Sequence, residues 1–247
     1  MSRGTKWLIA TCILVFLAVI AANLPASLAA RWLPATVSFG SLSGTLWHGE
    51  AVAVRAAGID VERLEWHLHP LALLGGRVSM HVEVTQAEDH LSADLILSAD
   101  RIEAYGVDAT IDVATLAGRV LPAGWAGPTR LNFEEIVFSG NWITSIRGTA
   151  ETGTLKGPAD AQPFLGSYRL QFDQDAVAKP DLLVGHFRDL SGPIEISGDL
   201  ELSRTRAVLS GWVRTRPAAA PKVVADIAKL PEVDPQGRRR FAIENNF

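Results

Sequence analysis

The hydrophobic positions of this chain follow two patterns, a continuous run at the amino terminus and an alternation over most of the remainder. In residues 7–22 only Thr11 is plainly polar. A helix of about 20 such residues crosses a hydrocarbon layer about 30 Å thick. Arg3 and Lys6 precede the run, and the positive-inside rule therefore places the first residues in the cytoplasm. The pattern predicts a single transmembrane anchor over residues 7–24.

A cleaved signal peptide is the competing interpretation of the same segment. It would have the same basic start, and Ser27-Leu28-Ala29 is an acceptable cleavage site. The apolar run is, however, slightly longer than a usual signal core, and Pro25 lies where a membrane helix would end. We therefore favour an uncleaved anchor, with a cytoplasmic tip at 1–6 and a linker at 25–34. Both interpretations export the rest of the chain.

Apolar and polar residues alternate through most of residues 35–215. This period of two predicts strands with one buried face and one solvated face. The alternation is clearest in five segments, residues 78–84, 91–97, 107–113, 131–134 and 194–202. Turn-forming pairs such as Gly75-Gly76 and Gly157-Pro158 separate the runs. The expected fold is mainly β, an elongated, curved antiparallel β-sheet domain that follows one transmembrane helix.

Helical signals in the exported part are few. Residues 70–74, which precede a glycine, predict a single turn. Residues 112–121 predict a short helix capped by Asp112, although their start also continues the preceding alternation. The strongest helix is expected at 218–230, with a proline near each end. It belongs to a carboxyl-terminal region, 216–247, expected to hold an Ala/Pro linker, this helix and a tail.

Cysteine content and charge narrow the class of protein. The single cysteine, Cys12, lies in the apolar run, so the exported part has no thiol for disulfides or for a multi-cysteine metal site. Arg3 and Lys6 are the only charges in the first 30 residues. Beyond them, 21 basic residues face 27 acidic residues, a net charge of −6. A mildly acidic body argues against a nucleic-acid partner.

A search for chemistry finds no catalytic, cofactor or metal site. His67, His69 and Glu65 would share one face of a strand, but a metal would need further ligands, and a solvated polar face is the better interpretation. The neighbouring acids Glu134 and Glu135 should point to opposite faces of a strand, which is unsuited to shared proton chemistry.

The chain is rich in tryptophan, with seven residues. Trp7 and Trp32 bracket the predicted anchor, as amphipathic rings at membrane interfaces often do. The other five lie in or near the strand-rich part, and we expect them to pack into its core. They are Trp47, Trp66, Trp125, Trp142 and Trp212.

Two neighbouring segments resemble a known family. Residues 43–51 read SGTLWHGEA, and residues 64–76 read LEWHLHPLALLGG. Gly-Thr-apolar-Trp-x-Gly after a single anchor, followed by Trp-x-apolar-x-Pro and Leu-Leu-x-Gly, is similar to type II secretion system protein N. The residues that match these motifs are Gly44, Thr45, Trp47, Gly49, Trp66, Pro70 and Gly76.

The resemblance implies a bitopic protein of the bacterial inner membrane, with a cytoplasmic amino terminus and a periplasmic β-rich domain. It would be an accessory part of the machine that exports folded proteins across the outer membrane. The implied partners are the inner-membrane clamp protein, the outer-membrane secretin and the bilayer around residues 7–24. The family implies no cofactor and no catalytic residue.

Two other classes remain open at this stage. The first is a lipid-binding or lipid-transport protein, in which the apolar faces of strands 78–84, 91–97 and 131–137 would line a groove for acyl chains. The second is an exported enzyme, which would need a pocket lined by clustered polar side chains.

Overall fold

A computed structural model gives the fold. The residues that it describes are 16, 19–30, 36–56, 59–116, 124–140, 142–157, 166–173, 177–179 and 181–246. Most of the predicted anchor lies outside these ranges, and the described residues 19–22 are helical. Within the described ranges, every helix is too short or too polar to span a bilayer.

The chain divides into two compact units, residues 1–87 and 88–247. The predicted β-rich domain at 35–215 extends over both of them. Alternation continues on each side of this boundary, so the sequence pattern carries no sign of it.

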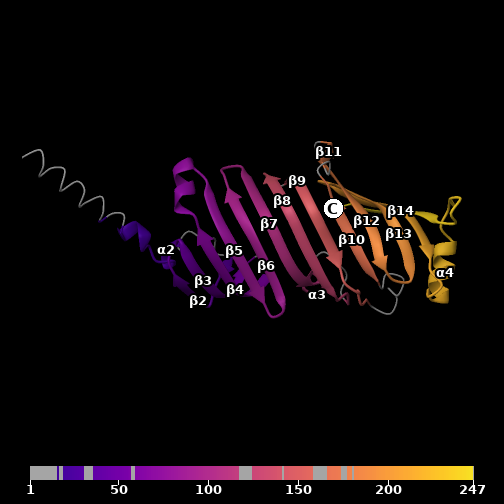
Figure 1. Cartoon of the computed structure of the whole chain (residues 1–247), viewed down its shortest axis with the longest axis horizontal. Helices are drawn as coiled ribbons and strands as arrows, with labels where there is room; N and C mark the ends of the chain where they lie inside the picture. Colours follow the sequence, from indigo (N-terminus) through magenta and orange to yellow (C-terminus); the bar gives the residue numbers. More distant parts are fainter. Residues whose placement is uncertain are drawn as a thin grey trace, which may run out of the picture. The chain divides into compact units, whose positions relative to one another are not determined.

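Unit 1 contains a small antiparallel sheet in which β3 is central (Figure 1). Its strands are β1 (Val37–Ser38), β2 (Ser41–Gly44), β3 (His48–Ala56), β4 (Ile59–Leu68) and β5 (Val78–Gln86). One side of β3 pairs with β1 and β2, and the other side pairs with β4, which in turn pairs with β5. A four-residue helix, α2 (Ser27–Ala30), precedes the sheet, and the turn predicted at 70–74 is the 3-10 helix η1 (Pro70–Gly75).

Unit 2 is a longer antiparallel ladder in which nearly every strand pairs with the next one in the chain. Its strands are β6 (Asp89–Leu97), β7 (Arg101–Asp112), β8 (Pro128–Ser139), β9 (Trp142–Thr152), β10 (Ser167–Phe172), β11 (Val177–Lys179), β12 (Leu182–Ser191), β13 (Ile194–Ser203), β14 (Arg206–Thr215) and β15 (Arg239–Asn246). The ladder runs β6-β7-β8-β9-β10-β12-β13-β14-β15, and β11 pairs with β12. The fold prediction, mainly β and antiparallel with few short helices, is confirmed.

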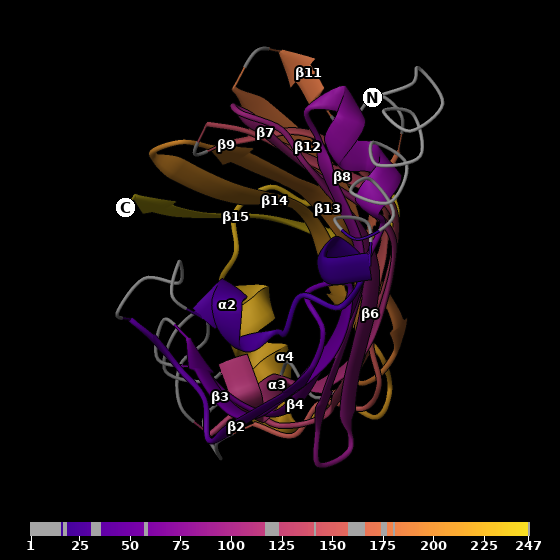
Figure 2. The ribbon, with the colours of Figure 1, turned by 90° about the vertical axis from the view of Figure 1, so that its left-hand side faces the viewer.

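Two short helices lie on one side of this ladder (Figure 2). The first is α3 (Val113–Leu116), where Asp112 accepts hydrogen bonds from the amides of Ala114 (2.7 Å) and Gly127 (3.0 Å). The alternation continues to the end of β7 at Asp112, and the predicted helix begins at Val113. The predicted residues 117–121 lie outside the described residues. The second is α4 (Pro221–Ala228), within the helix predicted at 218–230.

Among the described residues of unit 2, buried apolar side chains form two clusters. The first joins β6 to β12 through seven buried residues, Ala93, Ala104, Val107, Phe133, Ile146, Phe172 and Leu183. The second lies under α4, whose Val223 is only 2% exposed, and contains Tyr168, Ile194, Ile196, Val213 and Phe241. Phe241 comes from β15, so the expected carboxyl-terminal tail includes a strand that completes the core beneath α4.

The expectation for Glu134 and Glu135 is wrong. The register between β8 and β9 shifts between Phe133 and Glu135. Such a bulge inserts one residue and breaks the strict alternation of faces. Both carboxylates consequently lie near one guanidinium, with Arg147 Nε 3.0 Å from Glu134 and Arg147 Nη2 3.3 Å from Glu135.

Candidate functional site

The residues that carry the family motif gather at one end of the unit 1 sheet. Thr45 and Trp47 lie in the turn between β2 and β3, and Gly49 on β3 is directly opposite Trp66 on β4. The amide of Leu68 donates to the carbonyl of Trp47 at 2.7 Å, which joins the end of β4 to this turn. Segments separated in the sequence are therefore one structural feature, which we call the motif corner (residues 44–49 and 66–68).

Two glycines make the motif corner possible. Gly44 has φ of +85°, and a Cβ there would lie 2.4 Å from the carbonyl oxygen of His48. A Cβ on Gly49 would lie 2.2 Å from Cζ2 of Trp66, so the indole ring rests against a position that has no side chain. The ring is held there by a hydrogen bond from Trp66 Nε1 to the carbonyl of Leu46, at 3.1 Å.

Thr45 closes the turn through its backbone and its side chain. Its amide donates to the carbonyl of His48 at 2.6 Å, and its hydroxyl oxygen accepts from the amide of His48 at 3.1 Å. A side-chain oxygen that satisfies a turn amide is typical of threonine and serine in such positions.

The motif corner binds the amino-terminal segment of the same chain. Trp47 Nε1 donates to the carbonyl of Ala21 at 2.6 Å, and the amide of Leu46 donates to the carbonyl of Leu24 at 2.8 Å. The amide of Ala26 donates to the carbonyl of Gly44 at 3.2 Å, and Ala26 is only 2% exposed. The end of the amino-terminal segment is therefore attached to the sheet rather than linked loosely to it.

Sequence reasoning did not identify Ala21, Leu24 and Ala26 as part of this site, because the segment bonds mainly through backbone carbonyl and amide groups. It also placed the five tryptophans of the strand-rich part in the core, and Trp142 does pack against the first cluster of unit 2. Trp47 and Trp66 are only partly buried, and each uses its indole N–H to bind a carbonyl. The large amphipathic ring with a polar atom was the available signal for this role.

The last two motif residues lie at the two ends of η1. Pro70 occupies its first turn, where a missing amide is tolerated, and Gly76 closes it with φ of 70°. Between them, the side chains of Leu71 and Leu74 are 79% and 87% exposed.

A row of histidines crosses the unit 1 sheet and includes His48 and His67 of the motif corner. His48, His67 and His81 lie opposite one another on β3, β4 and β5. The ring centroids of His48 and His67 are 3.6 Å apart, and His69 stacks on His67 at 5.2 Å. His67 is exposed, but partial loss of solvent around its ring, followed by the charges of His48, His69 and His81, lowers its pKa.

The sequence associated only His67, His69 and Glu65 with this face. In the structure Glu65 lies 3.6 Å from the guanidinium of Arg63. Among the described residues, no group of three or more potential ligands has the geometry to hold a metal ion.

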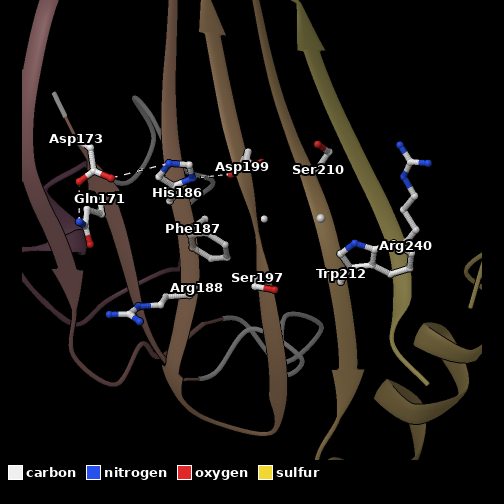
Figure 3. Close-up of a pocket in the computed structure, with 12 residues that line it drawn as sticks. Gln171, Asp173, His186, Phe187, Arg188, Ser197, Asp199, Ser210, Trp212 and Arg240 are labelled. Atoms are coloured by element: carbon white, nitrogen blue, oxygen red, sulfur yellow. Dashed lines mark hydrogen bonds and ion pairs between the residues drawn. The ribbon is translucent and has the colours of Figure 1, made fainter. Parts of the chain in front are cut away.

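Unit 2 has a separate hollow of about 680 Å³ on the polar side of β10, β12, β13, β14 and β15 (Figure 3). The imidazole of His186 lies between two carboxylates of this hollow, with Nδ1 2.8 Å from Asp199 and Nε2 4.0 Å from Asp173. Both ring nitrogens of His186 are directed at carboxylates, those of Asp199 and Asp173. This is not the arrangement of a serine nucleophile and its base.

Comparison with known proteins identifies the family of the chain. The chain is 27% identical over 251 residues to the type II secretion system protein N of Aeromonas hydrophila, an alignment covering 94% of this chain and 95% of the relative. No solved structure matches the chain significantly. The family model for type II secretion system protein N matches residues 35–242, a range that contains all seven motif residues. The chain therefore belongs to the type II secretion system protein N family.

Proposed function

We propose that this component of the type II secretion system is an accessory protein anchored in the inner membrane by residues 7–24. Its β-rich part lies in the periplasm and helps to connect the inner-membrane and outer-membrane parts of the machine. The observation that carries the proposal is the attachment of residues 21–26 to the motif corner.

The attachment supports an anchor that positions the sheet rather than a leader that is removed. Three hydrogen bonds hold the segment, from Trp47, Leu46 and Ala26. At about 1 kcal/mol net for each bond, they stabilise the docked segment by about 3 kcal/mol. A cleavage after Ala29 would discard the residues that the family motif binds.

A docked segment also restricts how the sheet is presented. With a freely jointed linker, the sheet would sample many orientations above the membrane. A docked anchor limits these orientations, which favours repeated contact with fixed partners in the assembly. The partners we propose are the inner-membrane clamp protein and the outer-membrane secretin.

Secretion and topology assays in the native host test this proposal. Deletion of the gene should reduce export of type II substrates, and the full-length chain should restore it. A photo-crosslinker in unit 2 should trap the clamp protein or the secretin. Unchanged export in the deletion strain, together with no such adduct, would refute the accessory role.

The anchor is tested separately. Alkaline phosphatase fused after residue 246 should be active, and the chain should stay in the membrane with residues 1–30 intact by mass spectrometry. A processed, soluble chain in the periplasm would refute the anchor while leaving the secretion role open.

A lipid-binding role is the second candidate, and one observation favours it. Several apolar side chains on the core face of unit 2 are only partly buried, among them Leu91, Leu95, Leu131 and Leu170. Acyl chains could cover such a face. Phospholipid that copurifies with the detergent-extracted chain at a fixed ratio would support this candidate, and lipid-free protein would refute it.

A further inference from the structure

We propose that η1 (Pro70–Gly75) inserts its leucine side chains into the interface of the bilayer beside the anchor. The proposal rests on the proposed function in one respect, because the anchor brings this end of unit 1 to the membrane. The contact adds a second attachment to the same membrane.

The first argument is exposure. Leu71, Leu73 and Leu74 are 79%, 42% and 87% exposed, within four consecutive residues. Single exposed leucines are common on soluble proteins, but a projecting cluster marks a surface that binds protein or membrane. In Figure 1 the turn is the purple coil beside β5.

The second argument is position. The carbonyl of Ala21, at the end of the amino-terminal helix, accepts the hydrogen bond from Trp47, and the carbonyl of Trp47 accepts the one from Leu68. Pro70 begins η1 two residues after Leu68. A short path of two hydrogen bonds therefore connects the end of the predicted anchor with the start of the leucine turn.

The third argument is the backbone. An inserted segment must satisfy its own polar groups, because lipid offers no partners. The amide of Ala72 donates to His69 at 3.2 Å, that of Gly76 to Leu73 at 3.0 Å and that of Arg77 to Ala72 at 3.3 Å. The turn therefore presents its leucine side chains while these three amides are bonded within residues 69–77.

The fourth argument is charge. Between Glu65 and Glu83 the chain has no acidic residue, and it has Arg77 and three histidines. Anionic headgroups attract basic residues and repel acidic ones. A leucine turn flanked by an arginine in an acid-free segment suits an anionic phospholipid surface.

A depth measurement on the full chain tests the insertion. Cys12 is the only cysteine, so a Cys12→Ser background accepts a fluorescent label at Leu74→Cys. The protein is reconstituted in vesicles of phosphatidylethanolamine and phosphatidylglycerol that contain nitroxide-labelled lipid. The matched control is Ala87→Cys, an exposed position just after the opposite end of β5.

Insertion predicts a blue-shifted emission and loss of fluorescence to nitroxide lipid at position 74, with neither effect at position 87. A membrane-bound chain whose label at position 74 is not quenched would overturn the insertion and leave the anchor intact. A chain that does not float with the vesicles would overturn the anchor and the insertion together.

A charged variant separates lipid from a protein occupant. Leu71→Asp with Leu74→Asp should leave the unfolding temperature unchanged, because both side chains are exposed. It should also abolish the quenching of a label at Leu73→Cys. A photo-crosslinker at Leu74 that yields a single protein adduct in cells, without lipid quenching in vesicles, would overturn the proposal in favour of a protein partner.

Discussion

Replacing Gly49 by alanine tests the packing that joins the two motif segments. The added Cβ would lie 2.2 Å from Cζ2 of Trp66, and two further ring atoms would lie within 3 Å. The indole ring would have to move, and its hydrogen bond to the carbonyl of Leu46, now 3.1 Å, would lengthen or break. Because Gly49 and Trp66 are opposite each other on β3 and β4, the ring has little room to shift within the sheet.

The expected cost follows from three contributions. Overpacking costs about 1–3 kcal/mol, and loss of the hydrogen bond costs about 1 kcal/mol. Alanine in a strand regains about 0.5–1 kcal/mol of backbone entropy relative to glycine. The net destabilisation is about 2 kcal/mol, which in a chain of this size lowers the unfolding temperature by about 4–8 °C.

Calorimetry or circular dichroism of the purified chain in detergent measures this change. Gly75→Ala is the matched control, because no atom lies within 4 Å of the Cβ it adds. The double variant Gly49→Ala with Trp66→Leu should melt close to Trp66→Leu alone, since the clash requires the ring. The packing argument is wrong if Gly49→Ala and Gly75→Ala have the same unfolding temperature. It is also wrong if the effects of Gly49→Ala and Trp66→Leu on the unfolding temperature are additive.

Three further changes test other parts of the structure. The carboxylate of Asp189 is 5% exposed and lies 2.6 Å from the guanidinium of Arg216, so Arg216→Ala removes its ion pair. Urea unfolding should show that the free energy of unfolding falls by about 3 kcal/mol. A decrease below about 1 kcal/mol would contradict a structural role for this ion pair. The pKa of His67 is lowered in the folded chain, so the unfolded chain binds more protons and stability should fall as the pH drops through about 6.5; the fall should be shallower in His67→Gln, and identical pH profiles would refute the coupling. Trp47→Phe keeps an aromatic ring but removes the hydrogen-bond donor to the carbonyl of Ala21. We expect the free energy of unfolding to fall by about 1 kcal/mol and proteolysis of the amino-terminal segment to become faster. Unchanged proteolysis would show that the backbone hydrogen bonds alone hold the segment.

The sequence predicted strands best where one face is packed and the other is wet. Residues 78–84 and 91–97 became β5 and β6 with little change in their bounds. The pattern failed at the bulge beside Glu134, since an inserted residue reverses the expected side of its neighbours. It also missed β15, because Arg239–Asn246 has little alternation of its own and is a strand through its pairing with β14.

Part of the motif corner was also predictable. The motif residues could be identified as a group, and tight turns around Trp47 follow from the glycines on either side. The direct contact between Gly49 and Trp66 could not be foreseen, because it depends on the register between β3 and β4. The histidine row has the same origin, since its members come from three strands.

By itself, the sequence determined the class of the protein: an apolar amino-terminal run, an acidic strand-rich body and a motif of one secretion family. These properties depend on local composition and on periods of two or four residues, which can be read along the chain. The tertiary structure alone decided that Trp47 binds Ala21 and that the leucine turn projects at the same end of unit 1. Such contacts depend on strand register and turn geometry, which a bulge or one shifted residue changes without altering the local pattern.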